Sequence, residues 1–84
     1  MVYEVKFKNK PRKFFNKLQK EEKKQIVKKL ERIRINPESY LIKLINSNSY
    51  KLIVGDFKLF IDLYKNELVV LVIKIGKRKN VYNR

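Results

Sequence analysis

Hydrophobic and polar positions alternate most regularly in the second half of the chain, over residues 50–75. Gly55-Asp56 and Lys65-Asn66 divide this stretch into three segments rich in β-branched and aromatic residues, which are typical of packed strands. Both dipeptides are compatible with tight turns. The pattern therefore predicts a meander of three antiparallel strands, followed by a basic tail that contains Tyr82.

The two turns also predict the register of this meander. A two-residue loop at the first turn places Lys51 opposite Phe60, and one at the second turn places Ile61 opposite Val70. Opposite residues share a face of a sheet. The apolar face, which is the expected core side, collects Tyr50, Leu52, Val54, Phe57, Leu59, Ile61, Leu63, Leu68, Val70 and Val72. The other face is mixed and collects Lys51, Ile53, Lys58, Phe60, Asp62, Val69, Leu71, Ile73 and Ile75.

The first half of the chain predicts one strand and two helices. Residues 2–7 alternate like a strand at a sheet edge. Asn9 is a candidate N-cap for a first helix, and a second helix is expected from residue 20 or 21 to about Ile35, where Asn36-Pro37 stops it. Apolar residues recur at helical spacing in both helices. Residues 38–49 are the least readable segment and are compatible with a short helical turn or with an irregular packed loop.

Together these elements predict a single α+β domain over residues 1–84. We expect an antiparallel sheet of about four strands, in the chain order β-α-α-β-β-β, with an N-terminal helix pair packed on its apolar face. The chain has no cysteine and no histidine. A disulfide framework and hydrolases of the Ser-His-Asp or zinc type are therefore excluded. We expect no cofactor and no metal.

The charge of the chain points to a polyanionic partner. Its 22 lysines and arginines against 8 acidic residues give a net charge of +14, and nucleic acid is the usual partner of so basic a protein. The simpler interpretation is a solvated lysine-rich surface, but few acidic residues offset the charge. No apolar segment resembles a signal peptide, and the longest apolar run, residues 68–73, is too short to span a membrane. We expect a cytoplasmic protein without a membrane partner.

The order of elements and several short segments resemble the RelE/ParE toxin superfamily, and RelE-type mRNA interferases most closely. The matching segments are Tyr50-Lys51-Leu52, Gly55-Asp56-Phe57-Lys58-Leu59, the apolar strand that ends in Gly76-Lys77-Arg78, and Val81-Tyr82. The resemblance covers nearly the whole chain and rests on the combination of segments. It implies a type II toxin that cuts mRNA in the ribosomal A site, where the RNA's own 2′-OH attacks the adjacent phosphate without a metal. Lysine, arginine and tyrosine can support such chemistry.

The resemblance implies roles for particular residues. Lys51 is a candidate for phosphate contact or for the base. Lys58 stands where RelE-type toxins usually carry an arginine on the scissile phosphate. Arg78 would stabilise the pentavalent phosphate, and Tyr82 is a base or stacking candidate. Further RNA contacts are expected from Phe60, Lys74, Lys77 and Lys79.

Two departures from the family pattern concern the contact with the phosphate, and either reduced activity or compensation by another lysine is compatible with them. Ile53 replaces a second lysine, and lysine at position 58 lacks the bidentate fork of arginine. Lys74 or Lys77 could compensate.

The same resemblance implies partners and leaves alternatives open. We expect an acidic, RelB-like antitoxin that wraps the basic surface, besides the ribosome and mRNA, and a monomer when the chain is free. A ParE-like toxin that binds gyrase is one alternative. A non-catalytic RNA- or ribosome-binding protein is another. Lys51, Arg78 and Tyr82 favour the nuclease, whereas Ile53 weakens that interpretation.

Overall fold

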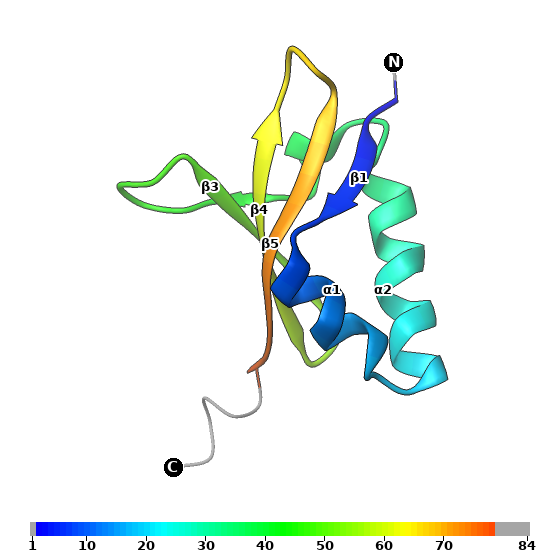
Figure 1. The fold of residues 1–84 in the computed structure, drawn as a ribbon. Coiled ribbons are helices and arrows are strands. Elements are labelled where there is room, and N and C mark those ends of the chain that lie inside the picture. The colour runs from blue at the N-terminus through cyan, green and yellow to red at the C-terminus, as the bar shows by residue number, and fades with distance from the viewer. Residues whose placement is uncertain (1, 79–84) are drawn as a thin grey trace.

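The computed structural model describes residues 2–78 and has two layers, a sheet and a pair of helices on one of its faces (Figure 1). Within this part of the chain, five strands form one sheet in the order β1-β5-β4-β3-β2. The strands are β1 (Glu4–Phe7), β2 (Ile42–Lys43), β3 (Ser49–Val54), β4 (Phe57–Tyr64) and β5 (Val69–Lys77). The helices are α1 (Asn9–Asn16), α2 (Lys20–Ile33) and the short 3₁₀ helix η1 (Pro37–Ser39). The α+β class and the helix pair on one face are confirmed.

The sheet is mixed and has five strands, not an antiparallel sheet of about four. β1 pairs in parallel with β5, with Glu4 opposite Val69 and Phe7 opposite Val72. Parallel neighbours are joined by a long crossover and not by a tight turn, so no local turn sequence indicates this pairing. β2 lies within residues 38–49, where a short helical turn or a packed loop was expected and no strand, and its two residues are too few to show a periodic pattern.

The second helix begins as expected and ends two residues early, at Ile33. Its N-cap is Gln19, whose backbone N–H donates to Glu22 Oε1 at 3.0 Å, forming a capping box. The expectation of Asn9 as N-cap of the first helix was wrong, because Lys8 holds that position. The Lys8 backbone N–H donates to the Val72 carbonyl at 3.0 Å, so pairing with β5 keeps this residue extended up to the start of α1.

The first hairpin has the expected register, whereas the register predicted for the second hairpin was wrong. Lys51 lies opposite Phe60. The loop between β4 and β5, however, contains four residues, 65–68, and it places Ile61 opposite Val72 instead of Val70. Leu68 closes this loop with a φ of +56°, a conformation that leucine rarely adopts. The register predicted from a two-residue turn therefore differs from the observed register by two residues.

A β-bulge at Ile73 changes which residues of β5 face the helices. Val72 lies opposite Ile61 and Lys74 lies opposite Phe60, so Ile73 and Lys74 together face one residue of β4. Strict alternation beyond Val72 would turn Lys74 towards the helices, where an unpaired charge is costly. The extra residue instead exposes Lys74 and buries Ile75, which was expected on the mixed face.

One hydrophobic core lies between the helices and the sheet. Its buried members are Ile26, Leu30, Ile33, Leu41, Leu52, Val54, Phe57, Leu59, Ile61, Val70, Val72 and Ile75. Phe14, Phe15 and Leu18 of the α1 region pack against it. Over residues 2–78 no charged or polar residue is buried, so the fold depends on apolar burial. The same residues include no helix that is long and apolar enough to cross a membrane.

Replacing Ile61 tests the central position of β4 in this core. Ile61 is fully buried, and Ile61→Ala is expected to lower the free energy of unfolding by about 2–5 kcal/mol. Ile45→Ala is the matched control, because Ile45 is 87% exposed and its replacement should change stability by less than about 0.5 kcal/mol. Urea unfolding followed by circular dichroism measures both. Equal effects of the two changes would contradict this core.

The two glycines should respond oppositely to alanine. Gly55 has a φ of +55°, and an added Cβ would lie 2.5 Å from Gln25 Nε2, so Gly55→Ala is expected to cost about 1–2 kcal/mol. At Gly76 an added Cβ meets nothing within 4 Å, so Gly76→Ala should be neutral or stabilise by up to about 1 kcal/mol. Thermal unfolding of both variants measures the difference. A Gly55→Ala protein as stable as the wild type would show that the turn does not need a left-handed residue.

Candidate functional site

Cationic side chains gather on the face of the sheet that the helices leave uncovered, called here the open face. Lys51, Phe60 and Lys74 form a row across β3, β4 and β5, because Lys51 lies opposite Phe60 and Phe60 lies opposite Lys74. Lys58 precedes Phe60 by two residues on β4 and therefore shares its face. Three cations from three adjacent strands thus surround one aromatic residue.

Phe60 is the centre of this group. The Lys58 Nζ lies 6.0 Å from the centroid of the Phe60 ring, and the Lys74 Nζ lies 5.6 Å from it. Both distances are within the range of a cation–π interaction. Phe60 is half-buried, so the ring holds two ammonium groups on one patch while part of its own surface stays accessible. We call Lys51, Lys58, Phe60 and Lys74 the cationic patch.

The charge of the cationic patch is not compensated within the described part of the chain. Over residues 2–78 no carboxylate pairs with any of its three lysines. Asp62 lies nearby on the same face, but its Oδ1 accepts a hydrogen bond from Ser49 Oγ at 2.6 Å. An anion bound here would therefore meet three lysines that have no competing acidic partner.

Two positions beside Lys58 define what can approach it. Gly76 lies directly opposite Lys58 on β5 and leaves the space there open, since an added Cβ would meet nothing within 4 Å. Ile53 lies directly opposite Lys58 on β3. RelE-type toxins carry a second lysine at the position of Ile53. This position therefore faces the cationic patch, and here it presents an apolar side chain.

Arg78 lies at the end of β5, beside the turn between β3 and β4. Its backbone N–H donates to the Asp56 carbonyl, and its Nη1 donates to the Gly55 carbonyl at 3.4 Å. Arg78 follows Gly76 by two residues and so comes to the Lys58 end of the sheet. The structure thus places the guanidinium next to the first hairpin turn.

Not every residue predicted for the site lies on the open face. Lys77 is opposite Phe57 on the helix side. Its Nζ lies 3.9 Å from Glu22 Oε2 and 5.8 Å from the centroid of the Phe57 ring. Lys79 and Tyr82 lie outside the described residues. The structure therefore brings Lys51, Lys58, Phe60 and Lys74 together and separates Lys77 from them.

Sequence reasoning missed two features of this face. The open space at Gly76 has no local signal, because it depends on the bulge that sets the β5 register. The Ser49–Asp62 pair could have been found, since two further steps of the first hairpin place these residues opposite each other.

The patch itself offers positive charge and an aromatic surface, which suit a phosphodiester backbone and an unpaired base.

Comparison with known proteins adds to this geometry. No protein-family model and no curated protein matches the sequence. A mutant of the E. coli toxin RelE in the free state superposes with a TM-score of 0.79 at 26% identity, over 98% of this chain and 90% of that chain. The chain has the RelE toxin fold. The resemblance stated from the sequence is thereby confirmed at the level of the fold.

Two further structures agree with the RelE fold. The E. coli RelE mutant in complex with an antitoxin RelBc peptide gives a TM-score of 0.78 at 28% identity, over 98% of this chain and 92% of that chain. The Mycobacterium tuberculosis toxin-antitoxin complex RelBE2 gives a TM-score of 0.83 at 16% identity, over 92% of each chain. At the latter identity the match concerns the fold alone.

Proposed function

We propose that this protein is the toxin of a type II toxin-antitoxin system and that it cuts mRNA on the ribosome. The RelE fold supports the toxin role, and several solved structures with this fold are complexes of RelE with RelB. The cationic patch is the observation that carries the nuclease part of the proposal. It gathers three lysines around Phe60, without acidic partners among residues 2–78.

The proposed reaction is an attack by the RNA's 2′-OH on the adjacent phosphate. The 2′-oxygen loses a proton and bonds to phosphorus, and the 5′-oxygen of the next nucleotide leaves and takes up a proton. Lys58 would hold the scissile phosphate in the space that Gly76 leaves open. Arg78 would stabilise the extra negative charge of the transition state, and Lys51 or Tyr82 would accept the first proton.

The cationic patch offers a physical reason why lysine can serve at position 58. A single ammonium group lacks the two parallel hydrogen bonds that a guanidinium makes to phosphate. Lys51 and Lys74 flank Phe60 from the two neighbouring strands and lie diagonally across from Lys58, at the separation where long side chains still interact. Several ammonium groups would therefore together bind the phosphate that one bidentate arginine would otherwise hold.

The proposal includes the partners that this activity requires. The substrate is mRNA bound to a translating ribosome, which places the protein in the cytoplasm. The net charge of +14 fits both the ribosomal RNA environment and an acidic antitoxin that would cover the toxin until it is released. We propose a monomer for the free toxin and a heteromeric complex with the antitoxin.

Replacement of Lys58 and Arg78 tests the nuclease proposal. Wild-type protein added to translating ribosomes should cut mRNA at A-site codons, mapped by primer extension. Lys58→Ala and Arg78→Ala should each lower the cleavage rate by about 100-fold or more, because each removes a charge from the phosphate. Lys13→Ala is the matched control, since Lys13 is an exposed lysine on α1 and its loss should leave the cleavage rate nearly unchanged.

Other outcomes of the same assay separate the alternatives. A folded wild-type protein that arrests growth without cutting mRNA would sink the nuclease proposal and favour a ParE-like action on gyrase. Absence of both cleavage and growth arrest would favour a binding protein without catalysis. Equal losses in Lys13→Ala and Lys58→Ala would show that only total charge matters.

A larger side chain at position 76 tests whether substrate enters next to Lys58. Gly76→Val should keep the thermal stability of the wild type, because the space around Gly76 is open and valine suits a strand. Cleavage should nevertheless fall by about tenfold or more, since the valine occupies the place of the phosphate. Gly76→Ala serves as the smaller control. Full cleavage by a stable Gly76→Val protein would rule out this entry route.

A further inference from the structure

The open face continues beyond the cationic patch onto β1, which is the outer neighbour of β5 (Figure 1). Val5 and Phe7 pack against the core, so Lys6 between them points to the open face. The Lys8 backbone N–H donates to the Val72 carbonyl at 3.0 Å. Lys8 is also extended, with a φ of −72° and a ψ of 168°, so the alternation of β1 continues through this residue. The Lys8 side chain therefore emerges on the open face, like that of Lys6.

Lys8 extends the row of residues that crosses the sheet at Phe60. Lys51 and Lys74 lie opposite Phe60 on the two neighbouring strands. Lys8 comes one residue after the last paired residue of β1, and so lies level with the bulge of β5. Neighbouring strands are about 4.8 Å apart, so the row from Lys8 to Lys51 spans about 14 Å. A polyanion that crosses the strands here would meet three cations and one aromatic ring.

A hollow lies at the β1 end of this row. Its volume is about 630 Å³, which is within the range of about 300–1,000 Å³ that is typical of ligand sites. It is lined by Lys8, Asn9, Lys10, Pro11 and Ile73. Ile73 is the extra residue of the bulge. The insertion that exposes Lys74 therefore also provides part of the wall of this hollow.

The two cations of the hollow have no acidic partner in the described chain. Over residues 2–78 no carboxylate pairs with Lys8 or Lys10, and both residues are exposed. Asn9 is exposed as well and is not the N-cap of α1, so its amide can turn towards a ligand. Pro11 and Ile73 add apolar surface. Ammonium groups and an amide beside an apolar wall suit the phosphate and sugar of a nucleic acid.

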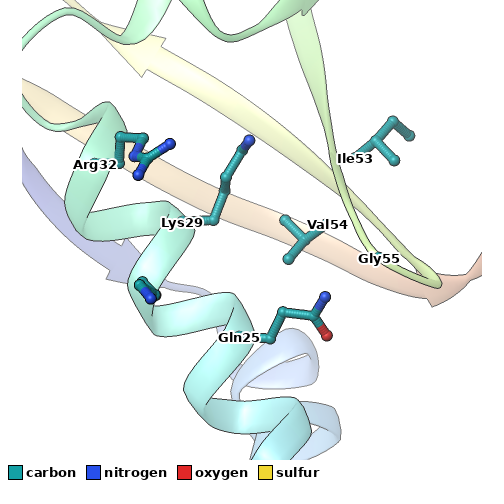
Figure 2. A pocket seen from close by; sticks show the side chains of 7 residues that line it. Gln25, Lys29, Arg32, Ile53, Val54 and Gly55 are labelled. Carbon is teal, nitrogen blue, oxygen red and sulfur yellow. The ribbon is translucent and has the colours of Figure 1, made fainter.

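Another basic hollow lies between α2 and the end of β3 (Figure 2). Its lining includes Lys28, Lys29 and Arg32. However, α2 lies on the opposite face of the sheet from the cationic patch (Figure 1). An RNA strand on the open face would pass from the patch directly to Ile73, whereas it would have to turn around the edge of β3 to reach α2. The position on the open face therefore favours the hollow beside Ile73.

We propose that Lys8 and Lys10, with the hollow beside Ile73, form a second phosphate site that binds the same single RNA strand as the cationic patch. The strand would cross the sheet with one phosphate at Lys58 and another, outside the cut, in the hollow. Lys74 lies between the two sites and would neutralise the intervening backbone. This second site rests on the proposed RNA substrate, but RNA binding is measured without cleavage.

RNA length tests whether the two sites lie on one strand. The probes are a uridine dinucleotide and an oligouridylate of about nine nucleotides, both 2′-O-methylated so that no hydroxyl can attack. Titration of the longer RNA into the ¹⁵N-labelled full chain should shift the amides of residues 8–10. The double variant Lys8→Ala, Lys10→Ala should bind it about tenfold more weakly. The slope of log affinity against log salt should fall by about 0.7, because one phosphate contact is lost. Dinucleotide binding should change by less than about twofold, since the removed charges lie about a Debye length from the patch.

Two matched variants separate the second site from the effect of total charge. Lys28→Ala, Lys29→Ala removes the same charge from the hollow at α2 and should lower the affinity for the longer RNA by less than about threefold. Lys8→Arg, Lys10→Arg keeps the charge and should bind like the wild type. Equal losses in the two alanine variants would overturn the proposal, because binding would then follow net charge. Equal losses for the dinucleotide and the longer RNA in Lys8→Ala, Lys10→Ala would also overturn it.

Ribosomal RNA is another source of phosphate, and a further measurement separates it. A Lys8→Ala, Lys10→Ala protein that binds the longer RNA like the wild type but binds empty ribosomes more weakly would overturn the single-strand path and assign the hollow to ribosomal RNA. On translating ribosomes this variant should raise KM by about tenfold and leave kcat nearly unchanged, since the hollow does not contact the reacting phosphate.

Failure of the second site and failure of the nuclease can be told apart in the wild type. A protein that binds the longer RNA with shifts at residues 8–10 and does not cut mRNA contradicts only the nuclease. A protein that cuts mRNA while the longer RNA leaves residues 8–10 unshifted contradicts only the second site.

Discussion

The alternation of side chains along β5 is the constraint on which the rest of the structure depends. β5 lies between β1 and β4, so its register fixes both the parallel edge and the central hairpin. Its sequence cannot satisfy both faces with strict alternation, because Val70, Val72 and Ile75 must be buried while Lys74 stays in water. The bulge at Ile73 resolves this conflict, since one extra residue exchanges the faces of everything that follows. The burial of Ile75 in the core and the position of Lys74 in the cationic patch are therefore consequences of the same insertion.

The elements of the fold were predictable where local sequence decides them. Gly55 takes a left-handed conformation in the first turn, which is the role its dipeptide indicated, and the hairpin register followed correctly. In the second hairpin the left-handed residue is Leu68, a residue type that gives no such signal. The parallel pairing of β1 with β5 joins segments that lie far apart in the chain. That pairing is set by burial of the whole sheet, which no single segment reveals.

In the candidate site, too, only the residues that local sequence positions were predictable. Lys51, Lys58 and Phe60 belong to the first hairpin, so turn chemistry and period-two alternation were enough to place them on one face. Lys74 and Lys77 lie after the bulge, where the count of residues no longer gives the face. Lys74 joins the patch, whereas Lys77 turns to Phe57 and Glu22. The hollow beside Ile73 depends on the same bulge and on the parallel pairing of β1 with β5, and the lysines at positions 8 and 10 alone cannot indicate either.

Charge links the cationic patch to the hollow beside Ile73 through a single strand. A net charge of +14 repels itself in the compact state and favours any polyanion that relieves it. β5 contributes to both basic surfaces, because Lys74 belongs to the cationic patch while Ile73 lines the hollow. The two surfaces adjoin, since these consecutive residues face one residue of β4. A phosphate held in the hollow would not contact the reacting nucleotide, so it would strengthen RNA binding equally before and during the chemical step. A strand held at several points along the sheet would therefore tolerate a weaker single contact at Lys58, where the ammonium group lacks the fork of arginine.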